Sequence, residues 1–266
     1  MSTAAVIGAR GFLGAAVAAG LERAGWQVLH IGRDTPLPAE PVDVVVDCAG
    51  DARRFFCNRD PAHSFAANVQ SVMTRLTRLR FGRYVYCSTV DVYGTGRGDR
   101  ATSGEASGIA LDGLDTYALH KYVAEQLVRH HAPGALVLRL GTLVGPGLKK
   151  NPVFDAVSGN PLRVTADSAL SLMHVDLAAD IVAALLQRGA AGIWNVTGRR
   201  SIAIPDLLAR VGEHGLGPAQ WLWHEETIRT LYDIDTGKLE QMIDLPDSDA
   251  ILRRHLALVT APVQAV

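Results

Sequence analysis

The feature that most constrains the fold is a glycine-rich turn at residues 8–14, GARGFLG. It follows a short apolar run at 4–7 and precedes apolar residues at helical spacing over 12–24, which predicts a strand, a turn and a helix in succession. Glycines allow a tight turn and the close approach of a pyrophosphate, whose charge meets the free N–H groups at the helix start. We therefore expect a dinucleotide site here.

The order of elements after this turn predicts the fold class. Apolar runs and helical spacing alternate through the first half of the chain, with strands expected at 27–31, 42–46, 83–87 and 135–140 and helices at 61–80 and 116–131. Strands that alternate with helices predict an α/β fold with a parallel, doubly wound sheet. Beyond 145–147 the pattern loosens into short pieces, with helices expected at 176–187 and 204–213.

Composition excludes several classes of protein. Of the 266 residues, 48% are apolar and 20% charged, and the net charge of −1 gives no field that favours nucleic acid or a membrane. Because the three cysteines, Cys48, Cys57 and Cys87, have no CxxC spacing, we expect buried reduced thiols, with no disulfide and no metal site. Without a leader or an 18-residue apolar segment, a soluble cytoplasmic protein is expected.

Cofactor choice depends on the end of the second strand. An NAD-specific site places Asp or Glu there to bond the ribose hydroxyls, but this chain has Gly32 followed by Arg33. Arg33, together with Arg10 in the glycine turn, could pair with a 2′-phosphate through charge-assisted hydrogen bonds. NADP(H) is thus favoured, while Asp34 keeps NAD(H) open, and both arginines could instead be solvated surface charges.

A tyrosine and a lysine stand one helical turn apart. Tyr117 and Lys121 are at positions i and i+4, so they share one face of the helix predicted at 116–131. We expect the cation to lower the tyrosine pKa, which allows proton exchange near neutral pH. At the end of an earlier strand Thr89 could hold the reacting oxygen, with Ser88 as a supporting hydroxyl.

These motifs together resemble the extended short-chain dehydrogenase/reductase family, which includes nucleotide-sugar epimerases, dehydratases and reductases. The resemblance covers about the whole chain. It rests on three motifs, Gly8-x-x-Gly11-x-x-Gly14, Ser88-Thr89-x-x-Val92-Tyr93-Gly94 and Tyr117-x-x-x-Lys121, with weaker matches at 45–50, 138–147, 174–178, 194–198 and 235–239. It implies a Rossmann domain over 1–147, joined by some later segments, and a small C-terminal α+β substrate lobe over 148–266.

The resemblance also implies roles for individual residues. Tyr117 would be the acid/base, Lys121 would position the nicotinamide ribose and Thr89 would hydrogen-bond the substrate oxygen. The residues implied or argued to bind the cofactor are Gly8, Arg10, Gly11, Phe12, Leu13, Gly14, Arg33, Cys48, Ala49, Gly50, Asn68, Tyr117 and Lys121. Relatives often pair through the helices that begin near 61 and 116, so a homodimer is possible.

Two departures from the family pattern bear on the reaction. Members that eliminate water usually have Asp-Glu or Ser-Glu after the threonine, whereas this chain has Val90 and Asp91. Val90 cannot protonate a leaving hydroxyl, which disfavours a 4,6-dehydratase, and Asp91 is either a catalytic carboxylate or a turn residue. The connection at 32–41 is shortened, as in nucleotide-sugar 4-keto reductases.

We therefore expect an NADP-dependent ketoreductase that acts on a nucleotide-linked deoxysugar or a similar hydroxylated metabolite. The alternatives are an NAD-dependent nucleotide-sugar epimerase or dehydratase and a reductase of a secondary-metabolite carbonyl. A non-catalytic nucleotide sensor is disfavoured because Thr89, Tyr117 and Lys121 are all present. Candidate phosphate contacts in the lobe are Lys149, Lys150, Arg163, Arg199 and Arg200, or these are scattered surface charges.

Overall fold

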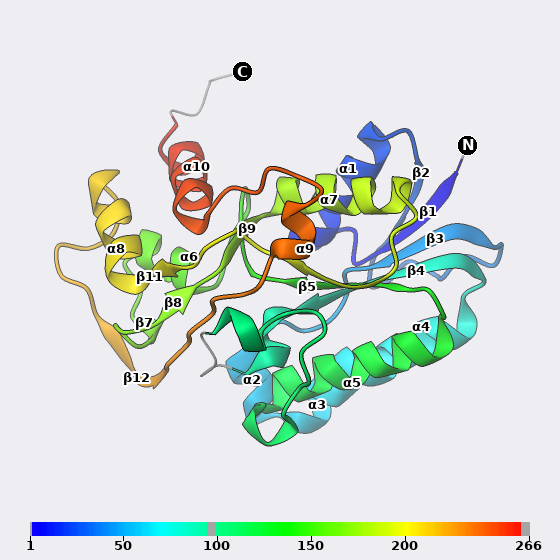
Figure 1. The fold of residues 1–266 in the computed structure, drawn as a ribbon, viewed down its shortest axis with the longest axis horizontal. Coiled ribbons are helices and arrows are strands. Elements are labelled where there is room, and N and C mark those ends of the chain that lie inside the picture. The colour runs from blue at the N-terminus through cyan, green and yellow to red at the C-terminus, as the bar shows by residue number, and fades with distance from the viewer. Residues whose placement is uncertain (1, 95–98, 262–266) are drawn as a thin grey trace. The chain divides into compact units, whose positions relative to one another are not determined.

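The computed structural model describes residues 2–94 and 99–261, and their main element is a six-stranded parallel sheet (Figure 1). The strand order is β10-β5-β4-β3-β1-β2. The strands are β1 (Thr3–Ile7), β2 (Gln27–Ile31), β3 (Val42–Asp47), β4 (Phe81–Thr89), β5 (Leu136–Leu140) and β10 (Gly192–Val196). The predicted α/β fold with a doubly wound parallel sheet is confirmed.

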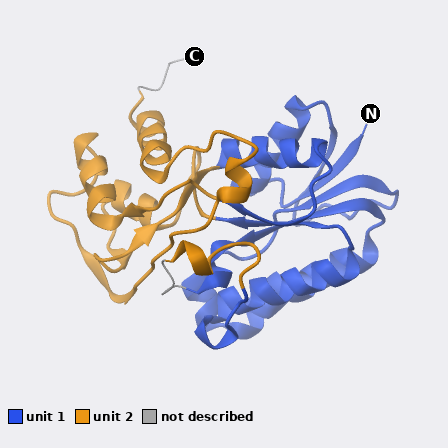
Figure 2. Ribbon diagram, viewed as in Figure 1, with its two compact units in different colours: residues 1–94, 108–140, 175–196 blue, residues 95–107, 141–174, 197–266 orange. Residues whose placement is uncertain are grey.

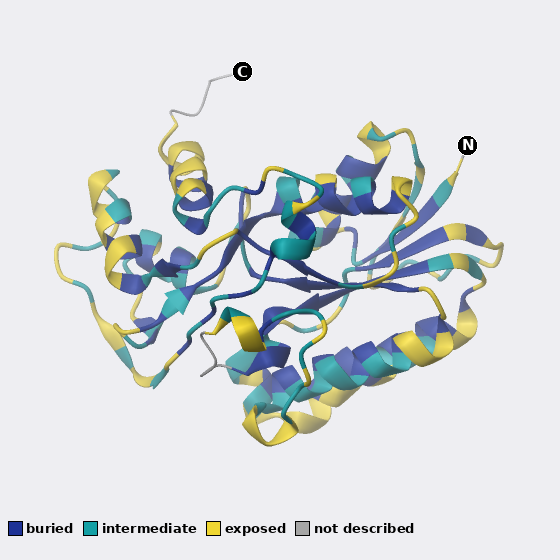
Figure 3. Ribbon diagram, viewed as in Figure 1, coloured by how far each residue is buried: buried dark blue, intermediate teal, exposed yellow. Residues whose placement is uncertain are grey.

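Helices cover both faces of this sheet (Figure 1). One face carries α1 (Phe12–Arg23) and α7 (Val175–Gln187), and the other carries α4 (Ser71–Arg78) and α5 (Thr116–His131). The helices α1 and α7 approach closely at Gly20, where an added Cβ would lie 2.9 Å from the Cβ of Ala179. Buried on both sides, strands β3, β4 and β5 are apolar along most of their length (Figure 3).

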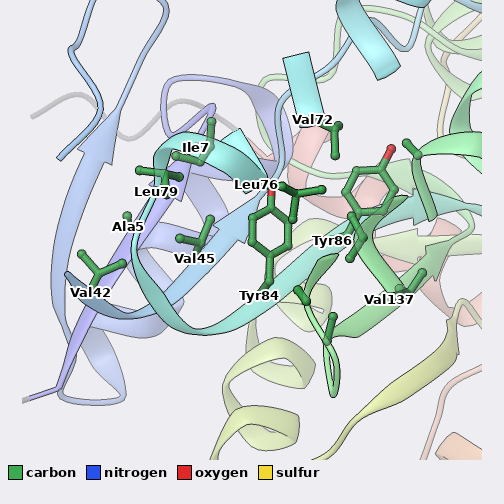
Figure 4. Close-up of a cluster of buried hydrophobic side chains, with 14 of the residues drawn as sticks. Ala5, Ile7, Val42, Val45, Val72, Leu76, Leu79, Tyr84, Tyr86 and Val137 are labelled. Carbon is green, nitrogen blue, oxygen red and sulfur yellow. The ribbon is translucent and has the colours of Figure 1, made fainter. Parts of the chain in front are cut away.

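The core on the α4 and α5 face is one cluster of buried side chains (Figure 4). Strand residues supply aliphatic groups and two tyrosine rings, and α4 supplies Val72 and Leu76. The labelled strand residues are Ala5, Ile7, Val42, Val45, Tyr84, Tyr86 and Val137. This cluster fixes the orientation of β4 and α5, the two elements that carry Thr89, Tyr117 and Lys121.

Residues 32–41 form the shortened connection between β2 and β3. These residues contain no helix or strand, and β3 lies on the far side of β1 from β2. Strand β2 is therefore an edge strand of the sheet.

The predicted helix at 61–80 is divided into three pieces. They are α3 (Pro61–Phe65), a π-helical segment at Ala66–Gln70 and α4. Four further α-helices of the described residues were not predicted, namely α2 (Arg54–Arg59), α6 (Pro152–Ser158), α9 (Gly237–Glu240) and α10 (Ser248–Thr260). Within the described residues no helix is both long and apolar enough to cross a membrane.

The chain divides into two compact units, coloured in Figure 2. Unit 1 comprises residues 1–94, 108–140 and 175–196, and unit 2 comprises 95–107, 141–174 and 197–266. The boundary between these units thus falls before the one expected at 147, and unit 2 also takes an earlier segment. The division into a dinucleotide-binding domain over 1–147 and a substrate-binding lobe over 148–266 stays a prediction.

Unit 2 combines small sheets with short helices in its described part. Its strand pairs are β11–β8, β12–β7 and β6–β9. The strands are β6 (Thr142–Val144), β7 (Leu162–Val164), β8 (Ala169–Leu170), β9 (Leu172–His174), β11 (Ile202–Ala203) and β12 (Trp223–Ile228), and the helices are α6 (Pro152–Ser158), α8 (Ile204–Glu213), α9 (Gly237–Glu240) and α10. They surround an aliphatic core of their own.

Candidate functional site

The glycine turn joins β1 to α1 and is closed by its own backbone. The N–H of Gly8 donates to the carbonyl oxygen of Ile31 at 2.8 Å, and that of Gly11 donates to the carbonyl oxygen of Gly8 at 2.8 Å. Gly8 has φ +79°, which favours glycine. An added Cβ at Gly14 would lie 2.1 Å from the carbonyl oxygen of Gly8, so only glycine fits this turn.

The start of α1 is suited to an anion. Gly11 is the N-cap residue, no side chain caps the helix and the first turn holds no acidic residue. The positive end of the helix dipole, at the free N–H groups of Phe12 and Leu13, is therefore not compensated by a capping or acidic side chain. The turn and helix fit the pyrophosphate of a dinucleotide.

Arg10 lies beside the end of β2, where Arg33 follows Gly32. An added Cβ at Gly32 would lie 3.5 Å from both Cδ and Nε of Arg10. Both arginines are exposed, and no hydrogen bond or ion pair engages either guanidinium within the described part of the chain. Two positive groups at this strand end fit a 2′-phosphate.

The loop after β3 is packed against the glycine turn. An added Cβ at Gly8 would lie 3.1 Å from the N atom of Ala49. Asn68 is buried and holds the loop from the other side, because its Oδ1 accepts from the N–H of Asp51 at 3.0 Å and its Nδ2 donates to the Asp51 carbonyl at 3.1 Å. Asn68 thus fixes the loop that contains Cys48, Ala49 and Gly50.

Thr89 and Ser88 face different partners at the end of β4. The Oγ1 atom of Thr89 accepts from the N–H of Asp91 at 3.2 Å, so its hydroxyl proton is left to donate. The hydroxyl of Ser88 donates to Oε1 of Glu125 at 2.5 Å, and Glu125 forms a buried 2.7 Å ion pair with Arg139. Ser88 therefore belongs to a buried network that anchors the strand end.

The Lys121 side chain is directed at the sheet. Its Nζ donates to the carbonyl oxygen of Cys87 at 2.8 Å and lies 4.2 Å from the centre of the Tyr86 ring. Burial lowers the pKa of Lys121 to about 8. The ammonium is thus bound at Cys87, two residues before Thr89 on β4. The proposed cofactor loop, which follows β3, lies beside this end of β4.

The expected lowering of the Tyr117 pKa is wrong. Burial, and then the charge of Asp91, raise the pKa of Tyr117 well above its usual value. The ammonium of Lys121 is engaged with the sheet and does not offset them. The phenol is therefore held in its protonated form.

Helix α2 contributes two residues that the sequence did not single out. The Nη1 atom of Arg54 lies 4.0 Å from Oδ1 of Asp91, and its Nε pairs with Asp115, the N-cap residue of α5. Asn58 accepts from the N–H of Tyr117 and donates to Asp115, both at 3.1 Å. Asp91 and the start of α5 are thus linked through α2, by residues whose spacing carried no recognisable motif.

The lobe arginines and lysines are spread over unit 2. Lys149, Lys150, Arg199 and Arg200 are exposed, and Arg163 lies 3.2 Å from Nδ1 of His224. No described contact joins them into one phosphate site.

Residues 4–197 match the model of the NAD dependent epimerase/dehydratase family. The chain therefore belongs to this family. It is an NAD(P)-dependent enzyme of the extended short-chain dehydrogenase/reductase type. A search among curated proteins finds no match.

Solved structures share the fold over nearly the whole chain. RMD from Pseudomonas aeruginosa, complexed with NADPH, is 21% identical, with 98% of this chain and 99% of that chain covered and a TM-score of 0.79. A dTDP-4-dehydrorhamnose reductase from Clostridium acetobutylicum is 16% identical, with 97% and 99% covered and a TM-score of 0.78. A UDP-glucuronic acid 4-epimerase mutant from Bacillus cereus, in complex with NAD, is 16% identical, with 97% and 98% covered and a TM-score of 0.78.

Proposed function

We propose that the chain is an NADP-dependent ketoreductase that reduces a carbonyl of a nucleotide-linked deoxysugar or a similar hydroxylated metabolite. The observation that supports the reductive direction is the pair of exposed guanidinium groups, Arg10 and Arg33, at the end of β2, which fits the 2′-phosphate of exchangeable NADPH. A net reductase consumes exchangeable NADPH, whereas an epimerase keeps and recycles a bound NAD. A site that prefers NADPH therefore favours reduction.

The proposed mechanism gives each polar group one task. The hydroxyl of Thr89 donates a hydrogen bond to the substrate carbonyl oxygen, and Tyr117 transfers its proton to that oxygen as the carbonyl carbon is reduced. When bound, NADPH supplies the hydride. Lys121 positions the nicotinamide ribose, and Asp91 favours the protonated phenol.

The proposed cofactor site is built around the glycine turn. Its fit rests on the uncapped start of α1 and on the two exposed guanidinium groups at the end of β2. The residues proposed to hold NADP(H) are Gly8, Arg10, Gly11, Phe12, Leu13, Gly14, Arg33, Cys48, Ala49, Gly50, Tyr117 and Lys121, with Asn68 acting through the loop that it anchors. NAD(H) stays an alternative because Asp34 is also exposed at this strand end.

The substrate class is proposed from two structural relatives. The dTDP-4-dehydrorhamnose reductase and the NADPH-bound RMD share the fold with this chain. Val90 has no ionisable group, which supports reduction over elimination of water. A secondary-metabolite carbonyl of similar size and polarity remains a second candidate.

An NAD-dependent nucleotide-sugar epimerase is the competing function, and the NAD-bound epimerase of the same fold favours it. The purified protein should distinguish the two. A reductase should contain little bound cofactor, bind added NADPH and oxidise it in proportion to a 4-keto sugar nucleotide. Tightly held NAD after purification, with sugar conversion and no net NADPH oxidation, would contradict the proposed function.

We also propose that the chain forms a homodimer through α3 and α5. Phe65 on α3 is 48% exposed, and its ring packs edge-on against His120 of α5 at 5.6 Å. An exposed aromatic ring is typical of an interface. Light scattering should give twice the monomer mass for the wild type and a lower mass for Phe65→Glu.

A further inference from the structure

Two cysteines lie against each other at the ends of β3 and β4. The Sγ atoms of Cys48 and Cys87 are 3.5 Å apart, and both residues are free thiols. The parallel register pairs Asp47 with Tyr86, so the next residue on each strand brings Cys48 beside Cys87. Equivalent positions on neighbouring strands project to the same face of the sheet.

This arrangement meets the geometric requirement for a disulfide with little backbone movement. Neighbouring strands are about 4.8 Å apart, and disulfides join Cα atoms that are about 4.4–6.8 Å apart. The two sulfur atoms need only approach from 3.5 Å to a bond length of about 2.05 Å. Cys48 is partly exposed and Cys87 is buried.

We propose that Cys48 and Cys87 are a redox-sensitive modification site that forms a reversible intramolecular disulfide. Two S–H bonds break and one S–S bond forms, and two electrons and two protons pass to an oxidant. Diamide accepts them at its N=N bond and becomes the hydrazine, and a small disulfide or a peroxide is reduced in the same way. A dithiol reductant reverses the step.

The two cysteines are linked to two parts of the proposed cofactor site, the Lys121 side chain and the loop after β3. The carbonyl oxygen of Cys87 accepts the hydrogen bond from Lys121, and Cys48 precedes Ala49, which packs against Gly8. Bond formation draws these two segments together. The consequence for NADPH rests on the proposed function, whereas formation of the disulfide does not.

The third cysteine provides an internal control. The Sγ of Cys57 in α2 donates to the carbonyl oxygen of Asp51 at 3.4 Å, and Asn68 donates to it at 3.9 Å. These contacts are thus with Asp51 in the loop after β3 and with Asn68 in the π-helical segment, and Cys57 should remain a thiol after oxidation.

The test is oxidation of the intact protein with diamide, followed by acid quenching, denaturation, thiol counting and peptide mass spectrometry. The hydrogen bond to Cys87, followed by burial, raises the pKa of Cys48. Oxidation is therefore run at mildly alkaline pH, where more thiolate forms. We expect the thiol count to fall from three to one, with a peptide that links Cys48 to Cys87 and is lost on reduction.

Variants complete the test. Cys57→Ala should still form the linked peptide, whereas Cys48→Ala and Cys87→Ala should not form any intramolecular link. Recovery of three thiols after prolonged oxidation of the wild type, or a link that involves Cys57 or a second molecule, would overturn the proposal. Because these readouts contain no substrate, they stand apart from the failure or success of the ketoreductase assay.

Bound NADPH gives a separate measurement of the consequence at the cofactor site. Saturating NADPH should slow disulfide formation several-fold, and the oxidised protein should bind NADPH more weakly until it is reduced. An oxidised protein that binds NADPH as tightly as the reduced form would overturn the inferred effect on the cofactor. NADPH binding by the reduced protein is measured first, so failure of the proposed cofactor site is recognised on its own.

Discussion

The glycine turn after β1 and the polar strand end after β4 are built by different means. In the turn, backbone atoms alone set the geometry, because the Gly8 carbonyl leaves no room for a side chain at Gly14. At the strand end, side chains of neighbouring helices take part, because Arg54 of α2 lies 4.0 Å from Asp91 and Lys121 of α5 donates to the Cys87 carbonyl oxygen. We propose that the first region presents a rigid surface to the cofactor and that the second sets the protonation of Tyr117.

The largest expected effect on turnover is at the polar strand end after β4. Tyr117→Phe removes the proposed proton donor while it keeps the ring, so turnover should fall by about 10²–10⁴-fold, the usual contribution of a positioned acid. NADPH binding should be retained, because only the phenol hydroxyl is lost and the other residues proposed to hold the cofactor are unchanged. Steady-state kinetics and NADPH fluorescence titration measure both, and wild-type turnover in this variant would contradict the assigned role.

The buried ion pair of Glu125 and Arg139, which is linked to the end of β4 through Ser88, should contribute to the free energy of unfolding. Glu125→Ala leaves Arg139 buried without its partner, which typically costs about 3–5 kcal/mol of unfolding free energy. Asp180→Ala, at the exposed pair with Arg23, is the matched control and should cost little. Urea unfolding compares them, and equal stability of the two variants would show that the buried pair does not support the strand end.

At the glycine turn, the expected loss is in cofactor binding. Gly14→Ala places a Cβ 2.1 Å from the Gly8 carbonyl oxygen, so the turn must open and NADPH affinity should fall. We expect at least about a tenfold loss, equivalent to about 1.4 kcal/mol. Gly212→Ala in α8 is the control, since an added Cβ meets nothing within 4 Å there. Unchanged binding by Gly14→Ala would remove the turn from the cofactor site.

A more selective change is expected at the end of β2. Arg33→Ala removes one charge-assisted hydrogen bond, about 1.5–3 kcal/mol, so NADPH should bind more weakly by about tenfold or more. Affinity for NADH should be unchanged, and Arg23→Ala at the other end of α1 should alter neither. Equal losses for both cofactors would end the argument for a 2′-phosphate contact.

The mildest expected effect is a pH dependence through Lys121. Burial lowers its pKa to about 8, so the ammonium form is lost as pH rises through that value. Turnover should fall above about pH 8. Over the range from there to the unfolded pKa of 10.5, the unfolded chain binds more protons, so this group's contribution to stability rises with pH. A pH–rate profile that stays flat above pH 8 would show that the ammonium is not required.

The two regions also differ in how far the sequence predicts them. The turn could be predicted because GARGFLG itself specifies the strand, the turn and the helix. The partners at the strand end could not, because Arg54 and Asn58 lie in the short helix α2, which has too few residues for a helical period. The Tyr117 pKa was wrongly predicted from its spacing to Lys121, since burial and Asp91 are tertiary effects.

Elsewhere, agreement with the predicted bounds differs from element to element and does not follow element length. The bounds of β2, α5 and α8 are those expected, whereas the helix predicted at 61–80 contains a π-helical segment around Asn68 that periodicity does not reveal. Helix α10 went unpredicted because the preceding segment breaks into short pieces. The strands of the sheet could thus be predicted from the local sequence pattern, whereas the partners at the candidate site depend on long-range contacts.

The central claim is that Tyr117 and NADPH act together in a net reduction. The most direct measurement follows deuterium from NADPH deuterated at the transferred position into product from a 4-keto sugar nucleotide. Reduction by NADPH with Tyr117 as the acid predicts one deuterium per product molecule and one NADPH oxidised, with both lost in Tyr117→Phe. Product that carries no deuterium and forms without NADPH oxidation would contradict this mechanism.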